Sequence, residues 1–390
     1  MRTVTNNKIT IVLCAALALL MSTPLAFAYP PDNAAVLYYR ACISHNVDSA
    51  MQEMLSDLSK GEIKLNEEIR KLVKRNRYAI AWVITAAEIQ NCDWGLDYSE
   101  GMSVLMPPFY DFRNLSRLIV ADAKILAEQA DYETALDRYL SLHKFARHVS
   151  DCTLVSHLVG ISMNNMANKC FQDVLAEVPE DLATLNWLKN ELVDIASRPF
   201  SAKTALNEET KWALMDMRME KIDEVLKILS GEGSAPYVKL ATDRINTANE
   251  EFFEKNREYY TNFMARFQAV LDMPYPQAYE TLEKLQPEKD LIENPDATLA
   301  ALFSPALSKV YSIAIKEKTF SNAIRTAVDI YIMKAKTGKL PDELSADSPL
   351  DLFSGKPFQY AKTAEGFILR CQGRDLDKDE IHGYEFKIKK

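Results

Sequence analysis

The chain has 390 residues, of which 48% are hydrophobic and 26% charged, and a net charge of −9 at pH 7. This composition can fill a large core, and the excess of acid disfavours nucleic acid as a partner because phosphate groups are repelled. Only 11 glycines occur. So few glycines disfavour nucleotide-binding loops and folds of many short strands, and we predict a mainly α protein.

Residues 1–28 have the pattern of a cleavable signal peptide. Arg2 and Lys8 precede the apolar run ITIVLCAALALLM, and the segment ends in the small-x-small triplet Ala26-Phe27-Ala28. The run is shorter than the ~20 residues that a membrane-spanning helix needs. We therefore expect a periplasmic or secreted protein with no transmembrane segment after the leader, and removal of the leader makes the net charge two units more negative.

Five cysteines remain after the leader is removed: Cys42, Cys92, Cys152, Cys170 and Cys371. Export permits disulfides, but the odd count leaves at least one cysteine free or paired between chains. No CxxC motif occurs, which excludes a zinc ribbon or a thioredoxin-type site. Burial as small hydrophobic side chains is the alternative for most of them.

Apolar residues recur every three or four positions through most of residues 29–305, which predicts a multi-helix bundle or a stack of helical hairpins. The clearest seam lies in residues 132–149 and comprises Tyr132, Ala135, Tyr139, Leu142, Ala146 and Val149. Further long helices are expected over 66–90, 109–129, 150–178, 180–197, 203–230, 235–271 and 296–337, the last broken near Ser304-Pro305.

Residues 115–149 resemble a tetratricopeptide-type helical hairpin. The segment QADYETALDRY is similar to the turn of that family, and Ala123, Ala135 and Tyr139 occupy its close-packing positions. No second copy follows at the family's period of about 34 residues, and a stable array needs about three repeats. The resemblance therefore implies one hairpin inside a bundle, with a concave peptide-binding array as the alternative.

The composition changes after Gly338, where KLPDELSADSPLDLFSGKPFQY brings proline, glycine, serine and aromatic residues. Gly355-Lys356 and Glu365-Gly366 are turn residues between strands. Apolar residues alternate along these strands, namely Phe358, Tyr360, Phe367, Leu369, Phe386 and Ile388. Three short strands need a helix to cover one face. We predict a small C-terminal antiparallel β-sheet packed on the last helix, in a cap of residues 306–390.

The order of motifs in this cap resembles the globular end of type II secretion pseudopilins. A helix runs into GKLP, an aspartate-led turn precedes GKPFQY, and a second strand leads into the acidic segment GRDLDKDE. The resemblance implies an α+β cap. The chain departs from the family at its N-terminus, where an ordinary cleavable signal is expected in place of the filament-forming apolar helix. With the segments YPPDNAAVLYYRA and CDWGLDYSEG and this C-terminal module, the whole chain is also similar to a group of secreted proteins of environmental bacteria. That similarity implies a location and a domain order but no activity.

The segment GRDLDKDE is the candidate metal site. It places Asp375, Asp377 and Asp379 at alternate positions, with Glu380 next. Oxygens at such spacing can converge on one hard cation, and the pseudopilin resemblance implies calcium. The alternative is a solvated acidic turn. No other cofactor is expected.

The segment CDWGLDYSEG is the candidate catalytic loop. It offers the acids Asp93, Asp97 and Glu100 beside the aromatic residues Trp94 and Tyr98. Paired carboxylates with aromatic platforms are typical of carbohydrate-active enzymes, in which one acid has a raised pKa and the other is ionised. The alternative is a connecting loop whose tryptophan fills the core.

A group of possible soft-metal ligands comprises His143, His148, Cys152 and His157. Their spacings of 5, 4 and 5 residues do not match the i, i+4 pair of a helical zinc site, and a helix break is expected between them. Ordinary packing explains these histidines better.

These observations favour a non-enzymatic binding or assembly component of the cell envelope, whose partner is an envelope protein or peptide. The alternative is an enzyme acting on polysaccharide through the acids of CDWGLDYSEG. Convergence of those acids in a deep pocket with shifted pKa values would favour the enzyme. A groove or an exposed apolar patch would favour the binding protein.

Overall fold

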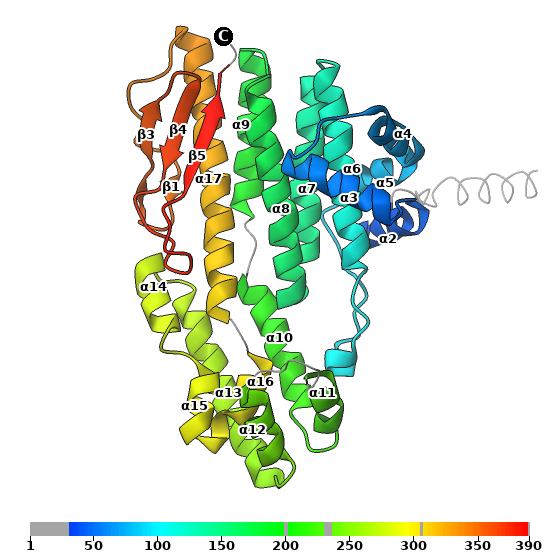
Figure 1. Cartoon of the computed structure of the whole chain (residues 1–390), viewed down its shortest axis with the longest axis vertical. Coiled ribbons are helices and arrows are strands. Elements are labelled where there is room, and N and C mark those ends of the chain that lie inside the picture. The colour runs from blue at the N-terminus through cyan, green and yellow to red at the C-terminus, as the bar shows by residue number, and fades with distance from the viewer. Residues whose placement is uncertain (1–30, 199–201, 230–235, 305–306, 389–390) are drawn as a thin grey trace, which may run out of the picture.

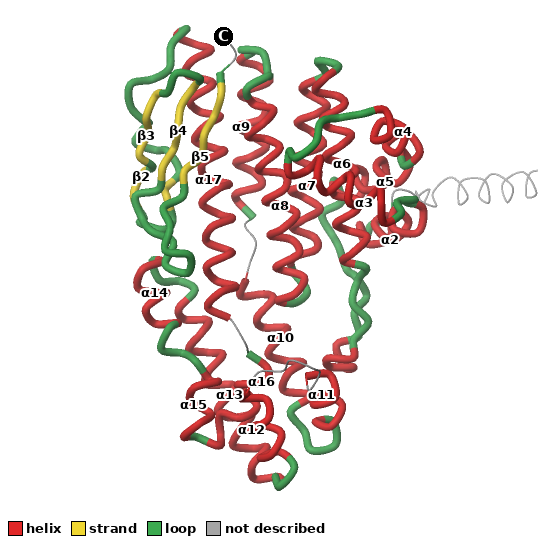
Figure 2. Tube along the Cα trace, in the orientation of Figure 1, coloured by secondary structure: helices red, strands yellow, loops and turns green. Residues whose placement is uncertain are grey.

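The computed structural model describes residues 31–198, 202–229, 236–304 and 307–388. The predicted signal peptide lies outside this range. The chain forms an elongated body of helices with a small sheet along one flank (Figures 1 and 2). The predicted mainly α fold with a C-terminal antiparallel sheet is therefore confirmed.

The first half of the chain is helical from Ala34 onward. Its helices are α2 (Ala34–Ser44), α3 (Ser49–Lys60), α4 (Glu67–Arg75), α5 (Arg77–Ala87), α6 (Phe109–Glu128), α7 (Tyr132–Ser150), α8 (Leu154–Leu175) and α9 (Leu182–Ser197). The single helix expected over 66–90 is broken at Asn76, whose buried amide accepts from the Asn46 N–H (2.7 Å) and donates to the Asn46 carbonyl (3.2 Å). The break satisfies a buried polar side chain, which outweighs helix continuity.

Helices α6 to α9 lie side by side because short capped turns join them. Asp131 caps α7 by accepting from the Thr134 N–H, and Thr153 and Ser156 form a capping box at the start of α8. The helix expected over 150–178 therefore begins about one turn later than predicted, after the cap at Thr153. The seam of α7 is confirmed, since Ala135, Tyr139, Leu142, Ala146 and Val149 are all buried.

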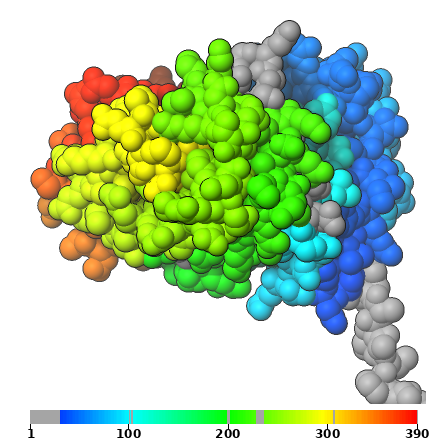
Figure 3. All heavy atoms as spheres, turned by 90° about the horizontal axis from the view of Figure 1, so that it is seen from below, coloured from blue at the N-terminus to red at the C-terminus, as the bar shows by residue number. Residues whose placement is uncertain are grey.

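A second group of helices covers one end of the molecule (Figure 3). It comprises α10 (Ala202–Asp216), α11 (Ile222–Leu229), α12 (Pro236–Ile245), α13 (Glu250–Val270), α14 (Tyr275–Leu282), α15 (Pro287–Glu293) and α16 (Thr298–Phe303). The expected helices over 203–230 and 235–271 are each divided in two. In α13 the aromatic stripe faces inward, with Phe253, Tyr260, Phe263 and Phe267 buried.

Helix α17 (Leu307–Thr337) joins the helical body to the cap, since it contacts α8 and α9 as well as β1 and β5. Buried apolar residues from Ala34 to Phe386 form one continuous cluster. The proposed domains 29–305 and 306–390 therefore share a core. The body is held together across that boundary rather than divided at it.

One long segment, Pro295–Thr337, is apolar enough to cross a membrane by length and composition, and it runs over residues outside the described ranges. The expectation that no such stretch follows the leader is therefore too strong. Most of its apolar window is buried inside the protein, and a buried core helix passes the same test.

The cap contains β1 (Leu350–Asp351), β2 (Lys356–Pro357), β3 (Gln359–Lys362), β4 (Gly366–Arg370) and β5 (Gly383–Lys387). Strands β1 and β2 pair with each other, and β3, β4 and β5 form an antiparallel sheet in that order. Phe320 of α17 stacks on Tyr384 with ring centroids 4.8 Å apart, and the Tyr331 hydroxyl donates to the Lys387 carbonyl. The prediction that the sheet packs on the last helix is confirmed.

Asp351 explains why the cap opens with an aspartate-led turn. Its buried carboxylate accepts from the N–H groups of Phe353 (2.9 Å), Gln372 (2.8 Å) and Gly373 (2.9 Å), and from the Ser354 hydroxyl (2.7 Å). One side chain thus ties the first turn of the cap to the loop after β4. A Cβ atom at Gly373 would collide with the backbone of Phe353.

Candidate functional site

The acids of CDWGLDYSEG stabilise their own turns. Asp93 accepts from the Gly95 N–H (2.9 Å), and Asp97 accepts from the Ser99 N–H (3.0 Å) and hydroxyl (2.6 Å). Both acids are exposed, and the bonds from Ser99 hold the pKa of Asp97 below its usual value. A general acid needs the opposite shift. The side chain of Glu100 lies outside the described residues.

The aromatic residues of this loop serve the core. Trp94 is only 6% exposed, lies against the rings of Tyr38 and Phe112, and donates its indole N–H to the His148 carbonyl (2.8 Å). Tyr98 is half-buried against Trp212. Trp94 therefore has no free ring face for a sugar, and it fills the core as the alternative interpretation of the loop expected.

The acidic segment of the cap gathers a different set of ligands from the one predicted. Asp375, Glu380 and His382 bring their ligand atoms together. Asp377 lies instead near the Lys378 amine (3.6 Å), and Asp379 pairs with Arg374. The sequence pattern gave no reason to include His382, which the turn between β4 and β5 returns to Asp375.

Both oxygens of the Asp375 carboxylate have protein partners. Oδ1 accepts from the Tyr275 hydroxyl (3.4 Å) and the Asp377 N–H (3.1 Å), and Oδ2 lies 2.9 Å from Nε2 of His382. The Tyr275 hydroxyl also accepts from the Leu376 N–H. Asp375 thus fastens the acidic segment to helix α14, which is a sufficient structural role for this buried carboxylate.

The histidines of α7 and α8 pack in the interior, as expected. Burial lowers the pKa of His143, His148 and His157 to about 4, so each ring is neutral near pH 7. Nδ1 of His148 lies 2.9 Å from the Tyr38 hydroxyl. Among the described residues, these histidines and Cys152 are not brought together as a set of metal ligands.

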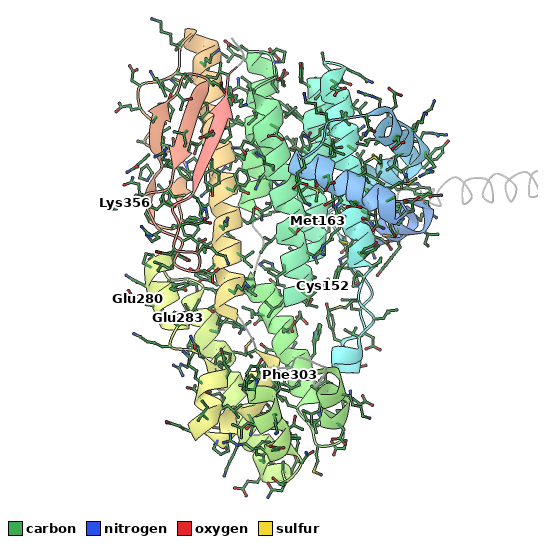
Figure 4. The ribbon with its side chains drawn as sticks, viewed as in Figure 1. Cys152, Met163, Glu280, Glu283, Phe303 and Lys356 are labelled. Atoms are coloured by element: carbon green, nitrogen blue, oxygen red, sulfur yellow. The ribbon has the colours of Figure 1, made fainter. Side chains whose placement is uncertain are left out.

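A cavity of about 180 Å³ lies between α7, α8, α9 and α17, and we call it the interhelical cavity. Figure 4 labels Met163, the residue before Asn164, midway along α8. The lining residues are His143, Arg147, Asn164, Asn168, Leu192, Ile195, Ala196, Arg198, Glu317, Lys318, Ser321, Asn322, Ile324, Arg325 and Leu352. Of these residues, only His143 belongs to a group of candidate ligands that the sequence pattern pointed out, and there as a possible metal ligand.

A buried carboxylate stands at the centre of the polar wall. Glu317 is 2% exposed, and its Oε1 accepts from the Asn164 amide and from the Ser321 hydroxyl (2.8 Å). Asn168 in turn donates to Ser321 (2.9 Å). Burial raises the pKa of Glu317 to about 7, although these two hydrogen bonds act in the opposite direction.

Two acceptor oxygens of this wall have unused hydrogen-bonding capacity among the described residues. Oδ1 of Asn164 is buried without a hydrogen bond of good geometry, although the His143 ring lies close enough to donate weakly to Asn164, which partly opposes the lowering of the His143 pKa by burial. Both described bonds to Glu317 end on Oε1, so its Oε2 has no described donor. We call Oδ1 of Asn164 and Oε2 of Glu317 the buried acceptors, since each oxygen keeps a lone pair for a further donor. Buried polar groups are normally paired, so this cluster indicates a place for a guest.

A sequence signal for this site existed but was weak. Asn164 and Asn168 interrupt the apolar pattern of α8 within SMNNMANK. Glu317 and Lys318 lie in IKEKTFSN, which looks like an ordinary solvated helix face. Only the packing of α17 against α8 turns that face inward.

Comparison with known proteins finds no relative of this chain. It matches no protein-family model, no curated protein and no solved structure. The resemblances to pseudopilins and to a tetratricopeptide hairpin therefore remain predictions from sequence motifs. The interhelical cavity is the site on which function can be argued from geometry.

Proposed function

We propose that this chain is an exported, non-enzymatic binding protein of the cell envelope that holds a small ligand in the interhelical cavity. The observation that carries the proposal is the cluster of buried acceptors at the cavity wall. An unpaired buried acceptor typically costs about 1–3 kcal/mol of stability. A ligand that donates to these atoms recovers that loss, which makes the site selective for polar guests.

Binding is favoured over catalysis by the groups that line the cavity. Glu317 is the one carboxylate among the lining residues, whereas glycoside hydrolysis uses two. The acids Asp93 and Asp97 lie elsewhere and stabilise their own turns. Among the side chains of CDWGLDYSEG that the structure describes, no feature favours a carbohydrate-active role. An envelope protein or peptide as partner of the cap stays a prediction from the sequence.

The experiment is a thermal-shift screen of the mature protein against a library of small polar metabolites, with native mass spectrometry of the purified protein to find a co-purifying ligand. Ala196→Phe fills the cavity from α9, and Ala183→Phe places the same side chain on an exposed position of the same helix. We expect hits that Ala196→Phe abolishes and Ala183→Phe retains. Hits that survive Ala196→Phe, or no hit and no co-purifying molecule, would contradict the proposal.

A further inference from the structure

The mouth of the interhelical cavity is basic. Arg147 on α7 and Arg325 on α17 are half-buried there, and we call this pair the basic rim. Neither makes an ion pair with a described residue, whereas the neighbouring Arg198 pairs with Asp194 at 2.9 Å. Burial lowers the pKa of both rim residues, and the charge of Arg198 adds to the lowering for Arg147.

An anion at the rim would relieve this arrangement. Arg325 makes only a long hydrogen bond to Asn322 (3.5 Å). The nearby carboxylates, Asp151 and Asp194 for Arg147 and Asp329 for Arg325, partly oppose the lowering of the pKa but form no ion pair with the rim. Each guanidinium has therefore lost hydration without full compensation. Guanidinium groups also present paired N–H donors that match the two oxygens of a carboxylate. The position of Arg147 one helical turn after His143 places this donor group on the same face of α7 as the histidine that lies against Asn164.

The deep end of the cavity has the complementary chemistry. The buried acceptors belong to residues that are only 2–3% exposed, whereas the rim residues are half-buried. A ligand therefore meets the two guanidinium groups before the acceptors, beside which Lys318 also lines the cavity. An amine or a hydroxyl group satisfies acceptors of this kind, and a second carboxylate would be repelled by Glu317.

Size and the remaining wall limit the ligand further. Leu192, Ile195 and Ile324 add apolar surface to the cavity wall. The volume of about 180 Å³ corresponds to about six water molecules, and it is below the usual range of sites for drug-sized ligands. The ligand is thus a small molecule with an apolar body, and not a polymer segment.

We propose that the interhelical cavity binds a small organic carboxylate that also carries an amine or hydroxyl group, with the carboxylate at the basic rim and the donor group at the buried acceptors. This inference rests on the proposed function and names its ligand class. Amino acids and hydroxy acids with apolar side chains both have this chemistry. The test distinguishes them.

Isothermal titration of the mature protein with four matched probes tests the inference. Leucine has amine and carboxylate, leucic acid has hydroxyl and carboxylate, isocaproate has only the carboxylate, and isoamylamine has only the amine. We expect leucine or leucic acid to bind at least about tenfold more tightly than either single-function probe, since one charge-assisted hydrogen bond contributes that much. Whichever of the two binds more tightly identifies the donor group.

Two variants separate the ends of the cavity. Arg147→Gln should weaken leucine, leucic acid and isocaproate by about tenfold and leave isoamylamine unchanged. Glu317→Gln should weaken the amine-bearing probes and leave isocaproate unchanged. Arg113→Gln, at an exposed position on α6 away from the cavity, is the control and should change nothing.

Equal binding of all four probes, tightest binding of isoamylamine, or no binding of any probe would overturn the inference. If no probe binds but the library screen yields hits that Ala196→Phe abolishes, the ligand class is wrong and the proposed function stands. If the hits bind the Ala196→Phe variant as well as the wild type, the proposed function itself is wrong. The two failures are therefore distinguishable.

Discussion

Two buried carboxylates, Glu317 in the interhelical cavity and Asp375 in the cap, differ in what their oxygens contact. Asp375 has protein partners on both oxygens, from Tyr275, the Asp377 N–H and His382. Glu317 receives both of its described hydrogen bonds on Oε1 and lines a cavity. Burial of a charge alone therefore does not indicate a binding site. The indicator is capacity for hydrogen bonding that the fold leaves unused.

The largest effect should come from removing the satisfied carboxylate. Asp375→Ala leaves Tyr275, the turn N–H groups and His382 without their acceptor, and we expect a loss of about 4 kcal/mol in the free energy of unfolding. Urea melts measure it. Asp377→Ala, which removes only a longer contact to Lys378, is the control and should stay within about 1 kcal/mol. Similar losses for both variants would remove the contrast between the two sites.

The cavity carboxylate should respond in the opposite direction. The pKa of Glu317 is raised from 4.5 to about 7 by burial, so the folded state holds a proton that the unfolded state releases, and stability falls as the pH rises from about 4.5 to 7. Glu317→Gln removes that ionisation. We expect the variant to be more stable than the wild type by up to about 3 kcal/mol near pH 8, and nearly equal to it near pH 4.

Thermal melts across this pH range measure the Glu317 effect, and Glu343→Gln at an exposed position is the control. A Glu317→Gln variant that is less stable at every pH would show that the carboxylate serves packing, as Asp375 does. Glu317 and Asp375 would then have the same structural role.

A smaller effect is expected from His143, across the same cavity. Burial lowers the pKa of His143 from 6.5 to about 4. Between these pH values the unfolded state binds a proton that the folded state does not bind, so the free energy of unfolding falls as the pH drops from about 6.5 to 4. His143→Gln should reduce this acid-side loss by about 2 kcal/mol, which is below the full linkage value because the cavity can admit water. Unfolding curves at several pH values below 7 measure it, and an unchanged slope would contradict the assignment.

The smallest effect is expected from calcium at Asp375, Glu380 and His382. A cation bound there at about 100 times its Kd would add about 2.7 kcal/mol. Because Asp375 already has protein donors on both oxygens, we expect a net gain below about 1 kcal/mol. Melts with calcium and with a chelator measure it. A larger gain that Glu380→Gln abolishes would make the acidic segment a metal site, as the pseudopilin resemblance implies.

The sequence predicted the helical body and the small sheet because both follow from local patterns. The seam of α7 and the alternation of Phe367, Leu369 and Phe386 report which side of each element is buried. Helix breaks were predicted less well. The break at Asn76 depends on Asn46, a contact between residues that are distant along the chain, and no local pattern contains it.

The site was decided by the tertiary structure. Asp93, Asp97 and Trp94 were predicted to form a site because acids and aromatic residues lie close together along the chain. In the folded protein Trp94 is buried in the core, and each of the two acids accepts hydrogen bonds within its own turn. Glu317 looks solvated until α17 packs against α8 and α9. Amphipathic periodicity tells which face of a helix is apolar, but which neighbour covers a polar residue is a property of the assembled bundle.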